Sequence, residues 1–305
     1  MLFGMLYFVI RFVNIADVLA NLKKISLSTL VSFFALVLSS KILYAFRWYL
    51  ICVKGIDLSK ISVLFFLRTN LLAEFVGIAM PSSLGGEAVR VIKLNGYSGA
   101  VAKSTVAIMS DRLIGLISMG LVALALLPKF GVSDVQWPVW SVDIVLCVIT
   151  LSAFGLALAI ISLKKIRDRI PILHAIQNFN LSFLLIIILL LLSGCGHLLF
   201  ASGYYLLFQE IHPLPFLVST VLLFTSQLAR IIPISLIGIG FGEISIVSLA
   251  SLLGVKPENT FIVVLVALGA VYFYAICGLM VELICDGKAF FSTVIRNASE
   301  SLEKS

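Results

Sequence analysis

Two segments rich in proline and glycine interrupt a chain that is otherwise strongly apolar. Residues 80–90 read MPSSLGGEAVR, and residues 232–243 read IPISLIGIGFGE. Each runs from Pro through Ser-Leu and glycines to Glu. Lipid cannot hydrogen-bond a broken backbone, so such breaks at membrane depth must be buried in protein or line a cavity. Two breaks, one in each half of a chain, point to a transporter-type substrate site.

The composition places the chain in a membrane. Apolar residues make up 61% of it and charged residues only 12%, whereas soluble domains carry about 25% charged residues. A helix needs about 20 apolar residues to cross the hydrocarbon. The shorter run Leu2–Val13 would be either a short tilted span or the end of a longer one. Five longer stretches predict spans: Ser28–Leu50, Ser104–Leu127, Trp140–Leu163, Leu181–Phe208 and Thr260–Cys285.

The domain organisation follows from the lack of any long polar stretch. The longest ones, 164–180 and the tail 286–305, are too short to form a core. We therefore expect one transmembrane domain over residues 1–305, ending in a polar tail from residue 285. The predicted fold is an all-α bundle of about 6–8 spans with two Pro/Gly-broken, re-entrant helices. The two similar breaks suggest an inverted internal repeat, although chance similarity remains the alternative.

Charge patterning predicts the orientation and excludes several functions. The densest basic cluster, residues 164–169, is cytoplasmic by the positive-inside rule, and so is the C-terminal tail. The net charge of +7 is not accompanied by a soluble basic domain, so a nucleic-acid role is not expected. The chain shows no metal-ligand spacing, nucleotide loop or hydrolase motif. We expect no enzyme activity, cofactor or metal.

The first break contains residues suited to bind phosphate. Glu87 and Arg90 are three residues apart, so they share a helix face and can pair. Gly85 and Gly86 leave backbone N–H groups free at the start of that helix, where a phosphate can bind beside an arginine. The alternative is an ion pair that only permits the helix break.

A second acid–base pair lies inside an apolar span. Asp111 and Arg112 are adjacent, and adjacent residues point about 100° apart on a helix. We therefore expect each to seek a partner on another helix, among Glu74, Glu87 and Arg90. Ionisable groups at this depth are costly and usually functional. The alternative is an interfacial pair that locks helices together.

The second break has its own polar residues. Arg230 precedes the break and Glu243 ends it, which suits a polar headgroup whose acyl tails remain in lipid. Asn70 and Glu74, one helical turn apart, lead into the first break. The residues expected to break the helices are Pro81, Gly85, Gly86, Pro233, Gly238 and Gly240.

Other polar residues in the spans have simpler explanations. Lys41 and Arg47 are predicted to snorkel to the interface, and Glu282 to reach it from the last span. His197 lies inside a span, where it either makes a structural hydrogen bond or relays protons.

With these residues in view, the chain resembles the lysylphosphatidylglycerol synthase transmembrane region. Three blocks carry the resemblance: FRW at 46–48, PxxLGGExxR at 81–90 with DRLIG at 111–115, and PISLIGIGxxE at 233–243 followed by Gly254. The resemblance implies an inner-membrane helical bundle with re-entrant helices that moves lipids or lipid-linked sugars between leaflets. Multidomain relatives add a soluble synthase, whose activity we do not expect here.

The chain departs from this family pattern at two places. Residues 77–80 read GIAM where members often carry Asn, and Gly242 stands where many have Arg. Both changes remove polar groups from the expected cavity. They bear on the identity of the headgroup more than on the fold.

We therefore expect translocation of an anionic phospholipid or a lipid-linked sugar across the inner membrane. Arg90, Arg112 and Arg230 would contact the headgroup, while Glu87, Asp111 and Glu243 would balance them; Glu74 and Asn70 complete the predicted site. The alternative is a non-catalytic accessory subunit for a glycosyltransferase or lipid synthase. The expected partners are membrane lipids and, under that alternative, an envelope glycolipid enzyme; oligomerisation stays open.

Overall fold

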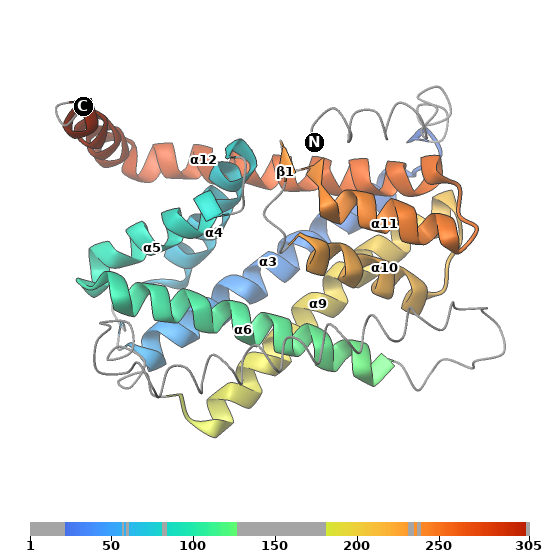
Figure 1. The fold of residues 1–305 in the computed structure, drawn as a ribbon, viewed down its shortest axis with the longest axis horizontal. Helices are drawn as coiled ribbons and strands as arrows, with labels where there is room; N and C mark the ends of the chain where they lie inside the picture. Colours follow the sequence, from blue (N-terminus) through green and yellow to red (C-terminus); the bar gives the residue numbers. More distant parts are fainter. Residues whose placement is uncertain are drawn as a thin grey trace.

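The computed structural model describes residues 22–56, 58, 61–80, 84–126, 181–230, 235–236 and 239–302. This part of the chain is helical apart from one pair of two-residue strands (Figure 1). The strands, Ser235–Leu236 (β1) and Ile239–Gly240 (β2), pair antiparallel with Ser235 opposite Gly240. The eight helices are α3 (Leu27–Gly55), α4 (Val63–Ala79), α5 (Leu84–Ser98), α6 (Val101–Leu126), α9 (Phe183–Ile211), α10 (Phe216–Ala229), α11 (Phe241–Leu252) and α12 (Pro257–Leu302).

Four helices are long and apolar enough to cross a membrane: α3, α6, α9 and the first part of α12, Pro257–Cys285. Each has 26 or 29 residues in its apolar portion, a length of about 39–43 Å at 1.5 Å per residue. They confirm four of the five predicted spans. The fifth, Trp140–Leu163, lies outside the described residues, as do Leu2–Val13 and the basic cluster 164–169.

Helices α3 and α9 form an antiparallel pair with the most extensive contact in the described structure. The Ser26 backbone N–H and hydroxyl both donate to the Glu210 carboxylate at 2.6 Å. These bonds join the start of α3 to the end of α9. Further along, the rings of Phe33 and Tyr204 meet edge to face at 6.1 Å. Gly203 makes this approach possible, because a Cβ there would lie 2.9 Å from the Phe33 ring.

The remaining short helices form two hairpins. Helix α4 packs on α5, and α10 packs on α11. These four helices have only 12 to 17 residues. Helix α4 follows the end of α3 and α10 follows the end of α9, and those two ends lie at opposite ends of the antiparallel pair. The hairpins therefore start from opposite ends of the bundle, and Figure 1 shows them on opposite sides of the view.

Helix α12 runs along both hairpins, packing on α4 and on α11. Its contact with α4 is close because residue 278 is glycine: a Cβ there would lie 2.5 Å from the Leu71 Cβ and 2.6 Å from the Leu71 carbonyl carbon. Two apolar cores result. One joins α3 and α9 to α10, α11 and α12, and the other surrounds Trp48 and Phe66 between α3, α4, α5 and α6.

The glycine at this crossing gives a direct test of the packing. We expect Gly278→Ala to destabilise the protein by about 1–3 kcal/mol, because the new methyl group would meet backbone atoms of α4. Gly269→Ala on the same helix is the control, since a Cβ there meets nothing within 4 Å. Thermal unfolding of the purified protein in detergent measures both. Equal melting temperatures for the two variants would contradict the close α4–α12 contact.

Candidate functional site

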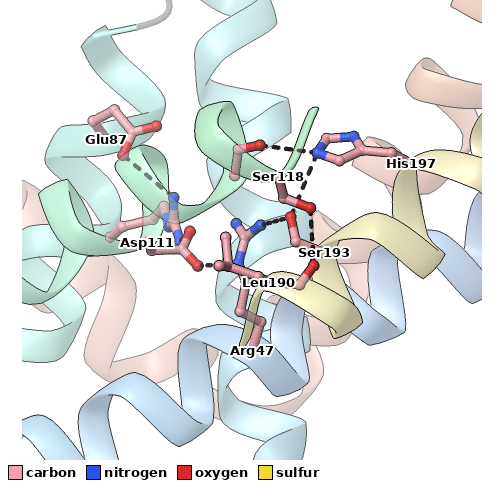
Figure 2. Close-up of polar contacts among 9 residues, drawn as sticks. Arg47, Glu87, Asp111, Ser118, Leu190, Ser193 and His197 are labelled. Atoms are coloured by element: carbon pink, nitrogen blue, oxygen red, sulfur yellow. Dashed lines mark hydrogen bonds and ion pairs between the residues drawn. The ribbon is translucent and has the colours of Figure 1, made fainter. Parts of the chain in front are cut away.

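A network of five charged side chains joins α3, α5 and α6, with Asp111 at its centre; Figure 2 shows Arg47, Glu87 and Asp111 among them. Asp111 Oδ1 accepts a hydrogen bond from Arg47 Nε at 2.8 Å, and Oδ2 accepts one from Arg90 Nη2 at 3.0 Å. Arg90 Nη1 also donates to Glu87 Oε2 at 3.4 Å. The other oxygen of Glu87 pairs with Arg112. We call these five residues the Asp111 network.

The Arg47–Asp111 pair at the centre of the network lies far from the ends of α3 and α6. Asp111 is ten residues into α6, or about 15 Å along the axis. Arg47 is eight residues from the end of α3, or about 12 Å. The side chains of Arg47, Arg90 and Asp111 are only 7%, 6% and 4% exposed. Charges at such depth are stable only when they are paired and hydrogen-bonded, and within membranes they usually serve a function.

Aromatic rings replace water around two of the guanidinium groups. The Arg90 Cζ lies 4.2 Å from the centre of the Trp48 ring, and the Arg47 Cζ lies 5.3 Å from that of Tyr44. A ring face attracts a cation, and more strongly where water is excluded. Arg47 passes beside Gly115, where a Cβ would come within 3.1 Å of its Nη1. The glycine thus leaves room for the arginine to reach Asp111.

A polar chain extends the network to α9. Arg47 Nη1 donates to Ser193 Oγ at 2.6 Å. His197 Nε2 lies 3.1 Å from the Gly115 carbonyl oxygen, which can only accept, so this nitrogen carries the proton. Nδ1 then accepts from the Tyr44 hydroxyl at 3.0 Å. Figure 2 shows Ser193 and His197 side by side on α9. The structural hydrogen bond predicted for His197 is present, and the proton relay stays a prediction.

The structure brings together four of the predicted site residues: Glu87, Arg90, Asp111 and Arg112. As predicted, Asp111 and Arg112 find partners on other helices. Of the three partners proposed for them, Glu87 and Arg90 are correct. Sequence reasoning did not identify Arg47 as a member of this network.

Arg230 and Glu243 form a second site, at the turn of the α10–α11 hairpin. Arg230 Nη2 donates to Glu243 Oε1 at 2.7 Å, and the Gly240 backbone N–H donates to Oε2 at 2.7 Å. Glu243 thus closes the start of α11 and holds the arginine that ends α10. Gly242 leaves room for this pair, because a Cβ there would clash with the Arg230 side chain.

The other predicted residues have different surroundings. Glu74 pairs with Lys41 of α3. Asn70 is half-buried one turn earlier on α4, and no hydrogen bond joins it to the described residues. Gly86 is buried against α4, where a Cβ would lie 2.5 Å from the Ala73 carbonyl oxygen. Gly85 is buried at the start of α5 and Gly240 caps α11; Pro81, Pro233 and Gly238 lie outside the described residues.

Three predictions about surface placement are wrong. Lys41 and Arg47 do not snorkel, because Glu74 and Asp111 neutralise them inside the bundle. Glu282 does not reach the interface: its side chain is 0% exposed, 3.2 Å from Arg68 Nε and paired with Lys93. The burial of Glu282 could have been predicted from the sequence, because a carboxylate within an apolar span requires a cation on a neighbouring span.

Four long apolar helices with a charge network between them define a multi-pass membrane protein. The chain belongs to the lysylphosphatidylglycerol synthase TM region family, whose model matches residues 1–278. This match confirms the resemblance seen in the sequence. It also connects the chain with a membrane domain linked to lipid synthesis and flipping. No curated protein and no solved structure matches the chain.

Removing the central carboxylate tests how the network is held. We expect Asp111→Asn to lower the free energy of unfolding by about 3–5 kcal/mol, because Arg47 loses its carboxylate partner while still buried. Unfolding by sodium dodecyl sulfate in mixed micelles measures this change. Glu258→Gln, at the half-buried start of α12, is the control and should change stability by no more than about 0.5 kcal/mol. Similar losses in both variants would mean that Asp111 has no special role.

Proposed function

We propose that this protein translocates a lipid with an anionic headgroup, either a phospholipid or a lipid-linked sugar, across the inner membrane. One observation carries the proposal: the Asp111 network holds three arginines against two carboxylates at membrane depth. A purely structural network is most stable when its charges balance, whereas this network carries a net positive charge. Arginine is also the side chain best suited to bind phosphate.

The network is open at one end. The Arg112 side chain is 62% exposed, in contrast to the buried Asp111 beside it. Arg112 lies in the middle of a membrane span, flanked by the exposed apolar side chains of Met109 and Leu113. A lipid could therefore place its headgroup on Arg112 while its acyl chains contact the apolar surface of α6. This arrangement suits a substrate that never leaves the bilayer.

The hairpins suggest how access to such a site alternates. We propose that α4–α5 and α10–α11 are re-entrant hairpins of an inverted repeat, since they start from opposite ends of the bundle. The second helix of each hairpin carries a glutamate in its first turn, Glu87 in α5 and Glu243 in α11. Each glutamate binds an arginine. Exchange of these ion pairs would let one hairpin open while the other closes.

The orientation follows from charge. We place the cytoplasmic face at the basic cluster 164–169 and the C-terminal tail, by the positive-inside rule. This assignment makes the tail after Cys285 cytoplasmic in a multi-pass inner-membrane protein.

A leaflet-accessibility assay in liposomes tests translocation. Reporter-labelled phosphatidylglycerol, aminoacyl-phosphatidylglycerol and a polyprenyl-phosphate sugar serve as probes. We expect one of them to move and Arg90→Ala to abolish the movement while the bundle stays folded. Arg112→Gln should slow it at least about tenfold, a loss equivalent to 1.4 kcal/mol of headgroup binding. Lys103→Gln, exposed on the same helix, is the matched control and should behave like the unmodified protein.

The outcomes separate the hypotheses. If Arg112→Gln moves lipid at the unmodified rate, the exposed arginine does not bind the substrate. If Arg90→Ala no longer folds, Arg90 has a structural role. If no probe moves even under an imposed ion gradient, the protein is better explained as an accessory subunit, which should co-purify with a glycosyltransferase or lipid synthase.

A further inference from the structure

We propose that the Asp111 network selects its substrate by charge: it accepts one phosphodiester with a single negative charge, and it discriminates against diphosphates and against headgroups with a net positive charge. This inference rests on the proposed function, because it concerns the same site. It narrows the substrate to a phosphodiester-linked lipid, which includes both phosphatidylglycerol-like lipids and prenyl-monophosphate sugars.

The charge count supports this selectivity. Arg47, Arg90 and Arg112 supply three positive charges, and Glu87 and Asp111 supply two negative ones, so the network carries one net positive charge. Water is largely excluded around its buried members, so an uncompensated charge there is costly. A monoanion brings the site to neutrality. A dianion would leave it negative, and a cationic headgroup would raise its positive charge further.

Unpaired donors point to the same chemistry. Arg90 Nε and Trp48 Nε1 are buried and find no hydrogen-bond acceptor among the described residues. The two groups are close, since the guanidinium lies over the indole ring at 4.2 Å. Trp48 is 0% exposed. Both atoms require an acceptor, and a phosphodiester provides two non-bridging oxygens. A headgroup ammonium provides only further donors.

Glu87 is the member of the network that a phosphate can replace. Its side chain is 24% exposed, and its bond from Arg90 is long at 3.4 Å. Asp111, in contrast, is buried between two arginines at 2.8 and 3.0 Å. Arg112, the other partner of Glu87, has a side chain that is 62% exposed, so a phosphate could reach it and take the place of the Glu87 carboxylate there while Asp111 stays bound. Glu87 therefore sets the net charge that the substrate meets.

Binding to the purified full-length chain in detergent tests the selectivity without requiring transport. The probes are dihexanoyl-phosphatidylglycerol, farnesyl-phosphate mannose, farnesyl-diphosphate mannose and dihexanoyl-lysyl-phosphatidylglycerol, and titration calorimetry gives each Kd. We expect one or both of the first two, each a monoanionic phosphodiester, to bind at least about tenfold tighter than the other two. The tighter-binding probe of these two shows whether the natural substrate is a phosphatidylglycerol-like lipid or a prenyl-monophosphate sugar. Tightest binding of the diphosphate or the lysyl lipid would overturn the proposal.

A variant with altered charge tests whether the net charge of the Asp111 network causes the selectivity. Glu87→Gln raises the net charge of the network by one, so the diphosphate should gain at least about tenfold relative to the monophosphate. A merely structural Glu87 would weaken all probes equally, and that result would overturn the proposal. Glu258→Gln removes a carboxylate outside the network and should leave the order of probes unchanged.

The two proposals can fail separately. Selective phosphodiester binding without movement in liposomes would leave the charge selectivity standing and reject translocation. Movement of lipid together with tightest binding of the diphosphate would retain translocation and reject the selectivity.

Discussion

The rest of the structure depends on one carboxylate, Asp111, held between Arg47 and Arg90. These two bonds connect α6 to α3 and to α5, and both lie where water is excluded. A buried ion pair of this kind adds little stability compared with apolar packing, but it is costly to break. It therefore ties the rotation of three helices together, because turning any one of them would leave a buried charge unpaired.

Ion pairs between charged side chains recur elsewhere in the bundle. Lys41 pairs with Glu74, Arg230 with Glu243, and Glu282 with both Arg68 and Lys93. These pairs join the α4–α5 hairpin by charges to α3 and α12, and the Asp111 network joins it to α6. Such contacts can exchange partners in a way that interlocked apolar side chains cannot. A hairpin held by them is suited to move without exposing an unpaired charge.

The Asp111 network differs in two respects from a set of ion pairs that only hold helices together. Its charges do not balance, and it reaches the surface of a membrane span through Arg112. Both features make sense for a protein whose ligand is itself a charged group attached to an apolar chain. The family match covers residues 1–278 and so includes the whole Asp111 network, whereas Glu282 lies beyond it.

The sequence alone determined the elements. Apolar length predicted four spans that the structure contains, glycines marked the start of the second helix in both hairpins, and the three-residue spacing of Glu87 and Arg90 predicted their contact. These properties are local, because helix periodicity and span length depend on neighbouring residues. The partners of buried charges were decided only by the tertiary structure. Arg47 meets Asp111 across 64 positions, and that pairing depends on how the helices are rotated and aligned against each other, which residue spacing within one helix does not specify.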